Sequence, residues 1–193
     1  MIVLYGYIKT MAEAREAELA AVTVGPLEFL DGPVRLDDYD ARWPEWFARE
    51  EERIRHALGD RVLRLEHVGS TSVPGLVAKP RIDILLVVAA PADEASYAPA
   101  LQAAGYTLRI REPDWHEHRM FRGPDTQVNL HVHGPDSPEI ERMLRFRDRL
   151  RDHAADRERY AAAKRELAAR RWRHIQDYAD AKSAVVEEIL RRG

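Results

Sequence analysis

The chain has 193 residues, of which 45% are hydrophobic and 33% are charged, with a formal net charge of −3 and no cysteine. This composition is typical of a globular domain with one sizeable core, and the slight acidic balance argues against general nucleic-acid binding, which usually needs a basic surface. The lack of cysteine excludes disulfides, thiolate metal sites and cysteine nucleophiles.

Residues 1–32 are predicted to form an N-terminal extension that is helical or partly disordered. Residues 11–21 are rich in alanine and glutamate, which favours a helix, and Met11 is an alternative start of translation. The N-terminus lacks a signal-peptide pattern, and no apolar run has the length of a membrane-spanning helix. We therefore expect a cytoplasmic protein without a membrane partner.

Helical and strand patterns alternate through one domain predicted over residues 33–193. Helices are expected at residues 40–58 and 91–104, and strands at residues 62–68, 82–88, 106–111, 118–122 and 127–133. From Pro138 the chain is helical, with segments at residues 138–153, 156–171 and 178–190. This order predicts an α/β (α+β) fold in which a twisted mixed sheet of four or five strands carries flanking helices and a C-terminal helical bundle.

The most suggestive residues lie between the first two predicted strands. Gly69 is followed there by Ser70, Thr71 and Ser72, and a glycine before hydroxyl residues lets backbone N–H groups approach an anion such as phosphate. Pro74 fits the first turn of a helix, whose dipole would add to that attraction. The alternative is an ordinary turn with a helix cap.

Asp83 lies near the start of the second strand, in a run that is otherwise apolar. A buried carboxylate needs a partner, so a metal ion, Lys79, Arg81 or backbone donors are the candidates. The alternative is that Asp83 has no functional role and is a hydrogen-bonded carboxylate at the end of a strand.

The strand at residues 127–133 has one core face and one polar face. Alternation places Val128, Leu130 and Val132 on the core face. The polar face carries Gln127, Asn129, His131 and His133. A site made of histidine and carboxylate ligands is a further alternative, drawn from His67, His116, His118, His131 and His133 with Asp83 or Glu117, although none of these has the HExxH spacing.

Residues 67–76, HVGSTSVPGL, followed by Ala78-Lys79-Pro80 and Ile82-Asp83-Ile84, resemble the signature of the GrpB family. The similarity covers about residues 34–190 and includes Tyr39, Trp43, Phe47, His118, Arg119, His131, Phe146, Tyr160, Lys164, Tyr178 and Lys182. This family is assigned to the polymerase-beta-like nucleotidyltransferase superfamily, whose members pair a Gly-Ser turn with a strand that carries Asp-x-Asp or Asp-x-Glu. Asp83 fits that pattern, whereas Leu85 replaces the second carboxylate.

The resemblance implies an enzyme that binds a nucleoside triphosphate and transfers a nucleotidyl group to a small acceptor. The phosphate-binding residues expected are Gly69, Ser70, Thr71, Ser72, Lys79, Arg81, Arg119, Lys164 and Lys182. Asp83 and His131 are expected to be catalytic and, with Glu117, to hold a divalent metal, Mg²⁺ or Mn²⁺. A histidine ligand suits Mn²⁺, Zn²⁺ or Fe²⁺ better than Mg²⁺.

Because Leu85 replaces the second carboxylate, a second interpretation is that the protein is a non-catalytic module that binds a nucleotide or coenzyme A. The family resembles a domain that is fused to dephospho-CoA kinase in some bacteria, which is why coenzyme A is a candidate ligand. The many arginines of the C-terminal helices are expected mainly on a solvated face, in ion pairs with residues one turn away.

Overall fold

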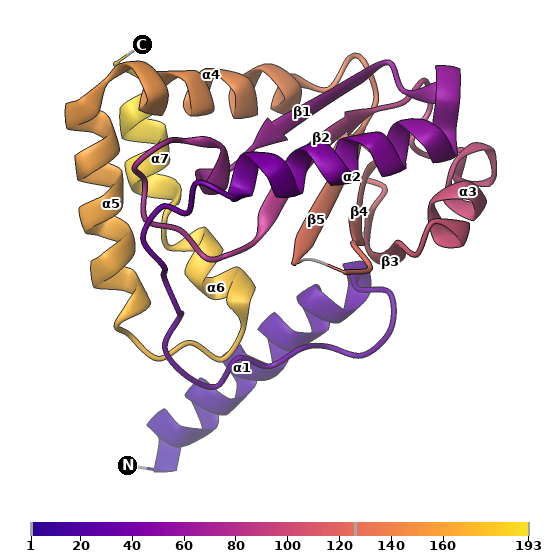
Figure 1. The fold of residues 1–193 in the computed structure, drawn as a ribbon. Helices are drawn as coiled ribbons and strands as arrows, with labels where there is room; N and C mark the ends of the chain where they lie inside the picture. Colours follow the sequence, from indigo (N-terminus) through magenta and orange to yellow (C-terminus); the bar gives the residue numbers. More distant parts are fainter. Residues whose placement is uncertain (1, 126, 193) are drawn as a thin grey trace.

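A computed structural model describes residues 2–125 and 127–192, with side chains described from Ala12 onward, and its centre is a five-stranded sheet of order β1-β2-β5-β4-β3 (Figure 1). The strands are β1 (Arg64–Val68), β2 (Ile82–Val87), β3 (Thr107–Glu112), β4 (His118–Arg122) and β5 (Val128–His133). β2 and β5 are parallel, and the other neighbours are antiparallel. The predicted mixed sheet and α/β fold are therefore confirmed.

Two helices cover one face of the sheet. α2 (Trp43–Leu58) carries Ile54 and Leu58, and α3 (Ala98–Ala103) carries Leu101, into a core shared with Ile84 and Leu130 of the sheet. Gly59, with a φ of 56°, ends α2 at the predicted residue. The helix expected at residues 91–104 is shorter, because a 3₁₀ turn, η3 (Glu94–Ser96), precedes α3.

The C-terminal helices cover part of the other face. α4 (Pro138–Asp152) packs Ile140 and Leu144 on Leu85 and Val87. α5 (Ala154–Ala168), α6 (Ile175–Asp180) and α7 (Ser183–Leu190) form a helical part beside the sheet (Figure 1). The single helix expected at residues 178–190 is therefore divided between α6 and α7, with a turn at residues 181–182.

The loop between β1 and β2 enters this helical part. Val73 and Leu76 are buried against Leu150 of α4 and Ile189 of α7. The loop that carries the polar turn is consequently fixed both by the sheet and by the C-terminal helices.

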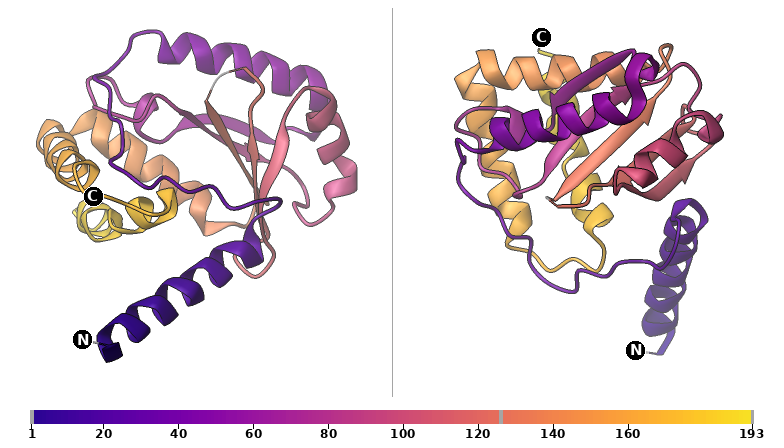
Figure 2. Two further views of the ribbon diagram at one scale, coloured as in Figure 1. Left: turned by 90° about the horizontal axis from the view of Figure 1, so that it is seen from below. Right: turned by 45° about the vertical axis from the view of Figure 1, so that its right-hand side comes forward.

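The N-terminal residues form α1 (Ile2–Val22), which extends away from the sheet, and a segment that crosses the molecule to α2 (Figure 2). Backbone hydrogen bonds fix this segment, including Val24 N to Arg109 O at 2.8 Å and Leu30 N to Arg173 O at 2.8 Å. The segment thereby links β3 to the C-terminal helices. Within the described residues, no helix combines the length and apolarity needed to cross a membrane.

Candidate functional site

The turn at residues 69–72 lies where β1 meets the start of β2. Gly69 has a φ of 68°, and a Cβ added there would lie 2.8 Å from the Cβ of Asp83. Both the backbone conformation and the close contact require glycine. The carboxylate of Asp83 is thus held directly against the turn.

Residues 70–72 form a single 3₁₀ turn, η2 (Ser70–Ser72), and the helix predicted to start at Pro74 is wrong, because residues 73–81 contain no helix. The hydroxyl of Ser72 donates to the carbonyl of Gly69 at 2.6 Å, which closes the turn. The first N–H groups of such a turn have no partner within it. An anion here would therefore meet backbone N–H groups and nearby cations rather than a helix dipole.

Asp83 is surrounded by polar groups of β5. Its Oδ1 accepts a hydrogen bond from Asn129 Nδ2 at 2.7 Å and lies 3.9 Å from His131 Nε2, too far for a direct hydrogen bond. Burial alone would raise the pKa of Asp83, but His131, Lys79 and Asn129 outweigh it and lower that pKa below its usual value. Asp83 is therefore ionised at neutral pH.

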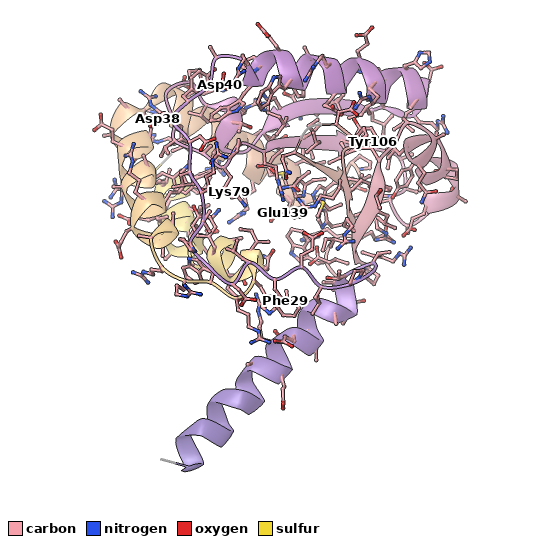
Figure 3. All side chains as sticks on the ribbon, turned by 60° about the horizontal axis from the view of Figure 1, so that its bottom comes forward. Phe29, Asp38, Asp40, Lys79, Tyr106 and Glu139 are labelled. Carbon is pink, nitrogen blue, oxygen red and sulfur yellow. The ribbon has the colours of Figure 1, made fainter. Side chains whose placement is uncertain are left out.

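Lysines from separate segments gather around this carboxylate. Lys164 of α5 donates from Nζ to the carbonyl of Val77 and lies 4.8 Å from the centre of the Tyr160 ring. Lys182 precedes α7 and lies 4.6 Å from the centre of the Tyr178 ring. Lys79, labelled in Figure 3, contacts that same ring at 5.8 Å.

Burial and mutual repulsion disfavour the charge on these lysines. Burial is the main cause, followed by Lys182, and together they lower the pKa of Lys79 to about 8 and that of Lys164 to about 6. Burial also lowers the pKa of Lys182. Among the described side chains, those of residues 12–125 and 127–192, no carboxylate forms an ion pair with these ammonium groups. The charge of Asp83 opposes the lowering of the pKa in all three lysines, and that of Asp180 adds to it at Lys182.

Two tyrosines complete this side of the site. Burial raises the pKa of Tyr160 to about 12, and the Ser70 side chain partly opposes that rise. Tyr178 is buried, and its hydroxyl finds no hydrogen-bond partner in the described part of the chain. On this side, the lysines are thus bordered by aromatic rings and hydroxyl groups.

A pocket of about 400 Å³ adjoins Lys79. Its walls include Lys79, Arg81 and Arg122, together with Phe29 and Leu30 of the N-terminal segment. Arg81 donates to the side chain of Gln127 at 2.5 Å, and burial lowers its pKa. The N-terminal segment, which lies outside the family signature, therefore borders the candidate site.

Arg119 and Glu117 do not join the other predicted site residues. Arg119 pairs in register with Val132, whose side chain lies in the core, and it donates to Glu94 at 2.5 Å. Glu117 is exposed, with a φ of 52°, in the turn before β4. No group of three possible metal ligands occurs among the described residues, so the expected set of Asp83, Glu117 and His131 is not assembled.

Leu85, which replaces the second carboxylate, is fully buried beneath α4. It lies on the same sheet face as Asp83, two residues along β2, and it pairs in register with His131. An acid at position 85 would be buried and would need a partner, whereas Leu85 contributes to the packing between β2 and α4.

The sequence did not predict the roles of two residues beyond His131. His118 Nε2 lies 3.1 Å from His131 Nδ1, and His118 Nδ1 lies 2.6 Å from Glu112 Oε2. Burial is the main cause of the lowered pKa of His118. The sequence signals for this contact were the density of histidine and acid in residues 112–118 and the place of His118 beside His131 in the alternative histidine site.

Comparison with known proteins identifies relatives over most of the chain. A UPF0157 protein of Halalkalibacterium halodurans is 59% identical over 177 residues, covering 92% of this chain and 91% of that protein. A dephospho-CoA kinase of Mycolicibacterium paratuberculosis is 31% identical, covering 83% of this chain but only 46% of the kinase.

A solved structure shares the fold. The conserved protein GrpB from Enterococcus faecalis superposes with a TM-score of 0.71 and 28% identity, covering 82% of this chain and 98% of that one. A weak likeness, with a TM-score of 0.39, extends to Cid1 in complex with a UTP analogue. The family model described as GrpB protein matches residues 33–192. The chain belongs to the GrpB family.

Proposed function

We propose that this protein is a nucleotidyltransferase-like enzyme that binds a nucleoside triphosphate and transfers a nucleotidyl group to a small acceptor. The observation that carries the proposal is the convergence of Lys79, Lys164 and Lys182 around Asp83, beside the 69–72 turn, with no carboxylate of the described side chains at ion-pair distance from their ammonium groups. Buried charges are normally paired, and a polyphosphate would provide the missing negative charge.

The parts needed to hold a triphosphate lie together. Ser70 and the N–H groups at the start of the 69–72 turn provide hydrogen-bond donors, and the lysines provide charge. Arg81 lines the adjoining pocket and adds a guanidinium. The apolar wall of that pocket, with Phe29 and Leu30, suits the base of a nucleotide.

Asp83 and His131 are the residues that would hold a divalent metal. Their facing atoms are 3.9 Å apart, and the two side chains are 30% and 25% exposed, so an ion and its other ligands have access. Magnesium and manganese sites in such enzymes are commonly completed by phosphate oxygens and water. A metal bound there would neutralise charge on the phosphate groups during transfer.

The first test is a binding and transfer experiment on the purified protein. ATP, GTP, CTP and UTP, labelled at the α-phosphate, are presented with Mg²⁺ or Mn²⁺, and thermal shift and label transfer to acceptor mixtures are measured. Lys164→Met should abolish the nucleotide-dependent shift. Asp83→Asn should retain nucleotide binding but lose both its metal dependence and transfer.

The control for this experiment is Asp148→Asn, because Asp148 lies outside the lysine cluster and pairs with Arg147 at 2.8 Å. This variant should bind nucleotides as the wild type does. The proposal fails if no nucleotide shifts the melting temperature, or if the shift survives Lys164→Met unchanged.

A non-catalytic module that binds a nucleotide or coenzyme A is the second candidate function. The burial of Leu85 favours it, because the strand that carries Asp83 offers no second acid to the site. The similarity to part of a dephospho-CoA kinase makes coenzyme A a reasonable ligand. Binding of coenzyme A without metal, unaffected by Asp83→Asn, would favour this function over transfer.

A further inference from the structure

The N-terminal segment forms part of the wall of the pocket that adjoins Lys79. This segment, residues 23–32, lies outside the family match of residues 33–192 and crosses from β3 to the C-terminal helices (Figure 2). It contributes Glu28, Phe29 and Leu30 to the pocket, and the loop between β1 and β2 contributes Lys79. A nucleotide whose phosphates lie at Lys79 would therefore place its base beside the N-terminal segment.

Phe29 provides an aromatic surface in this pocket. Its ring packs against His174, with the ring centres 5.0 Å apart, and the guanidinium of Arg173 lies 5.3 Å from its centre. Phe29, labelled in Figure 3, nevertheless remains 49% exposed. The ring is thus held in place while about half of it is open to a ligand, which suits the stacking of a nucleobase.

Glu28 adds a carboxylate to the same wall. Its Oε1 lies 3.1 Å from Arg109 Nη2, and its Oε2 lies 3.6 Å from Arg122 Nη2, which is longer than a hydrogen bond. The Glu28 side chain is 60% exposed. The two arginines therefore hold the carboxylate in position, and lone pairs of its oxygens remain available to a ligand.

Arg122 connects this carboxylate to the candidate site. It donates from Nη1 to Asn129 Oδ1 at 2.5 Å, and Asn129 donates from Nδ2 to Asp83 Oδ1 at 2.7 Å. A guanidinium has five N–H donors, so Arg122 retains donors for a ligand. The pocket therefore presents a carboxylate and a guanidinium side by side, close to Asp83.

Guanine is the base whose edge fits this pair of groups. Its O6 accepts from a guanidinium, while the neighbouring N1–H and 2-amino groups both donate to one carboxylate. Adenine, cytosine and uracil each present only one N–H-bearing group on that edge. They would consequently leave one oxygen of the carboxylate without a partner.

We infer that this pocket selects guanine nucleotides, with Glu28 accepting from N1–H and the 2-amino group, Arg122 donating to O6 and Phe29 stacking on the base. The inference rests on the proposed function, because it names the nucleotide of the same site. Glu28 and Phe29 lie outside the family match, whereas the lysines lie within it. Base selection and phosphate binding thus depend on different parts of the chain.

The first test compares nucleotides on the wild-type full chain by isothermal titration calorimetry in the presence of Mg²⁺. GTP should bind about 10- to 100-fold more tightly than ATP, CTP or UTP, because each loses a hydrogen bond to a charged group. Inosine triphosphate, which lacks only the 2-amino group, should bind about 10-fold more weakly than GTP. Equal affinities for GTP and inosine triphosphate would overturn the inference.

The second test replaces the carboxylate. Glu28→Gln should weaken GTP binding by about 10- to 100-fold and remove the difference between GTP and inosine triphosphate. Tripolyphosphate has no base, so its affinity should not change. Equal losses for GTP, ATP and tripolyphosphate would show a general structural effect and contradict a contact with the base.

Glu18→Gln is the matched control for this substitution. Glu18 is also an exposed carboxylate of the N-terminal extension, where it pairs with Arg15 at 3.3 Å, but it does not line the pocket. The variant should bind GTP and inosine triphosphate as the wild type does. A loss equal to that of Glu28→Gln would contradict a specific role of Glu28.

These outcomes separate the inference from the proposed function. Preference for GTP over inosine triphosphate in a protein that transfers no nucleotidyl group would keep the guanine pocket and refute the transferase. Transfer from all four nucleotides, bound with equal affinity, would keep the transferase and refute the guanine pocket.

Discussion

The pocket of about 400 Å³ and a larger pocket of about 760 Å³ both adjoin the loop between β1 and β2. They differ in whether the basic side chains nearest that loop have acidic or carbonyl partners. In the larger pocket, Arg147 donates to Glu66 at 2.9 Å and to Asp148 at 2.8 Å, and Arg151 donates to the carbonyl of Ser72 at 2.9 Å. In the smaller one, Arg35 and Arg122 are paired with Asp37 and Glu28, whereas Lys79 has no carboxylate at ion-pair distance among the described side chains.

Pocket volume is therefore a poor guide to the candidate functional site in this protein. The arginines of the larger pocket are structural, because acids and carbonyl groups of the protein already satisfy them. His67, in the same pocket, stacks on Phe47 at 4.8 Å, and burial lowers its pKa to about 4, so it is neutral. The lysines, by contrast, are buried, which lowers their pKa and disfavours their charged form.

The two pockets should differ most in how substitution of their basic residues changes the affinity for an anionic ligand. Lys164→Met should weaken tripolyphosphate binding by about 30- to 100-fold, because a hydrogen bond to a charged group contributes about 2–3 kcal/mol. Arg147→Met should leave the affinity unchanged. Isothermal titration calorimetry measures both, and equal losses in the two variants would show that the lysines are not a dedicated site.

The next largest effect is expected from a substitution at Gly69, where the 69–72 turn contacts Asp83. Gly69→Ala forces a residue with a Cβ into a positive φ and against Asp83, which should cost about 2–3 kcal/mol of unfolding free energy. Gly75→Ala is the matched control, because its φ is 77° but nothing lies within 4 Å of the added Cβ. It should cost about 1 kcal/mol. Equal costs in urea denaturation would mean that the contact with Asp83 is not constraining.

Stability should change in opposite directions in the two pockets. Lys164→Met should raise the free energy of unfolding by about 2 kcal/mol at pH 7, since folding no longer has to deprotonate a buried amine, at the cost of one hydrogen bond to Val77. Arg147→Met should lower it by about 1–2 kcal/mol, because Glu66 loses a partner. Destabilisation by both changes would indicate that the lysine is structural.

The pH dependence of stability gives a smaller effect of known sign. The pKa of Lys164 is about 6 in the folded protein and near 10.5 when unfolded, so the unfolded state binds more protons between these values. Stability should therefore rise between pH 7 and 8, by about 1.3 kcal/mol more in the wild type than in Lys164→Met. Parallel curves for the two proteins in chemical denaturation would contradict the low pKa.

Much of the fold could be predicted because its patterns are local. The alternation in β5 identified the core face correctly, and the apolar face of α2 identified that helix. The helix expected at Pro74 was wrong because Val73 and Leu76 are drawn into the C-terminal core, which no local pattern reveals. The break between α6 and α7 has no glycine or proline to mark it.

The candidate site was less predictable because it depends on tertiary contacts. The contact between Gly69 and Asp83 follows from a strand, a turn and a neighbouring strand. The ion pair that removes Arg119 from the site comes from Glu94, on a distant segment. The family signature, rather than any spacing, pointed to Lys164.

The most direct test of the account is the pKa of Lys164 in the wild-type protein, followed by NMR of its side-chain Cε and Nζ with and without tripolyphosphate. The account predicts a pKa of about 6 in the free protein, with burial as the main cause. Tripolyphosphate should raise it above neutrality, with proton uptake from the buffer. A pKa near 10.5 that tripolyphosphate does not change would contradict the claim that these lysines are held for an anionic ligand.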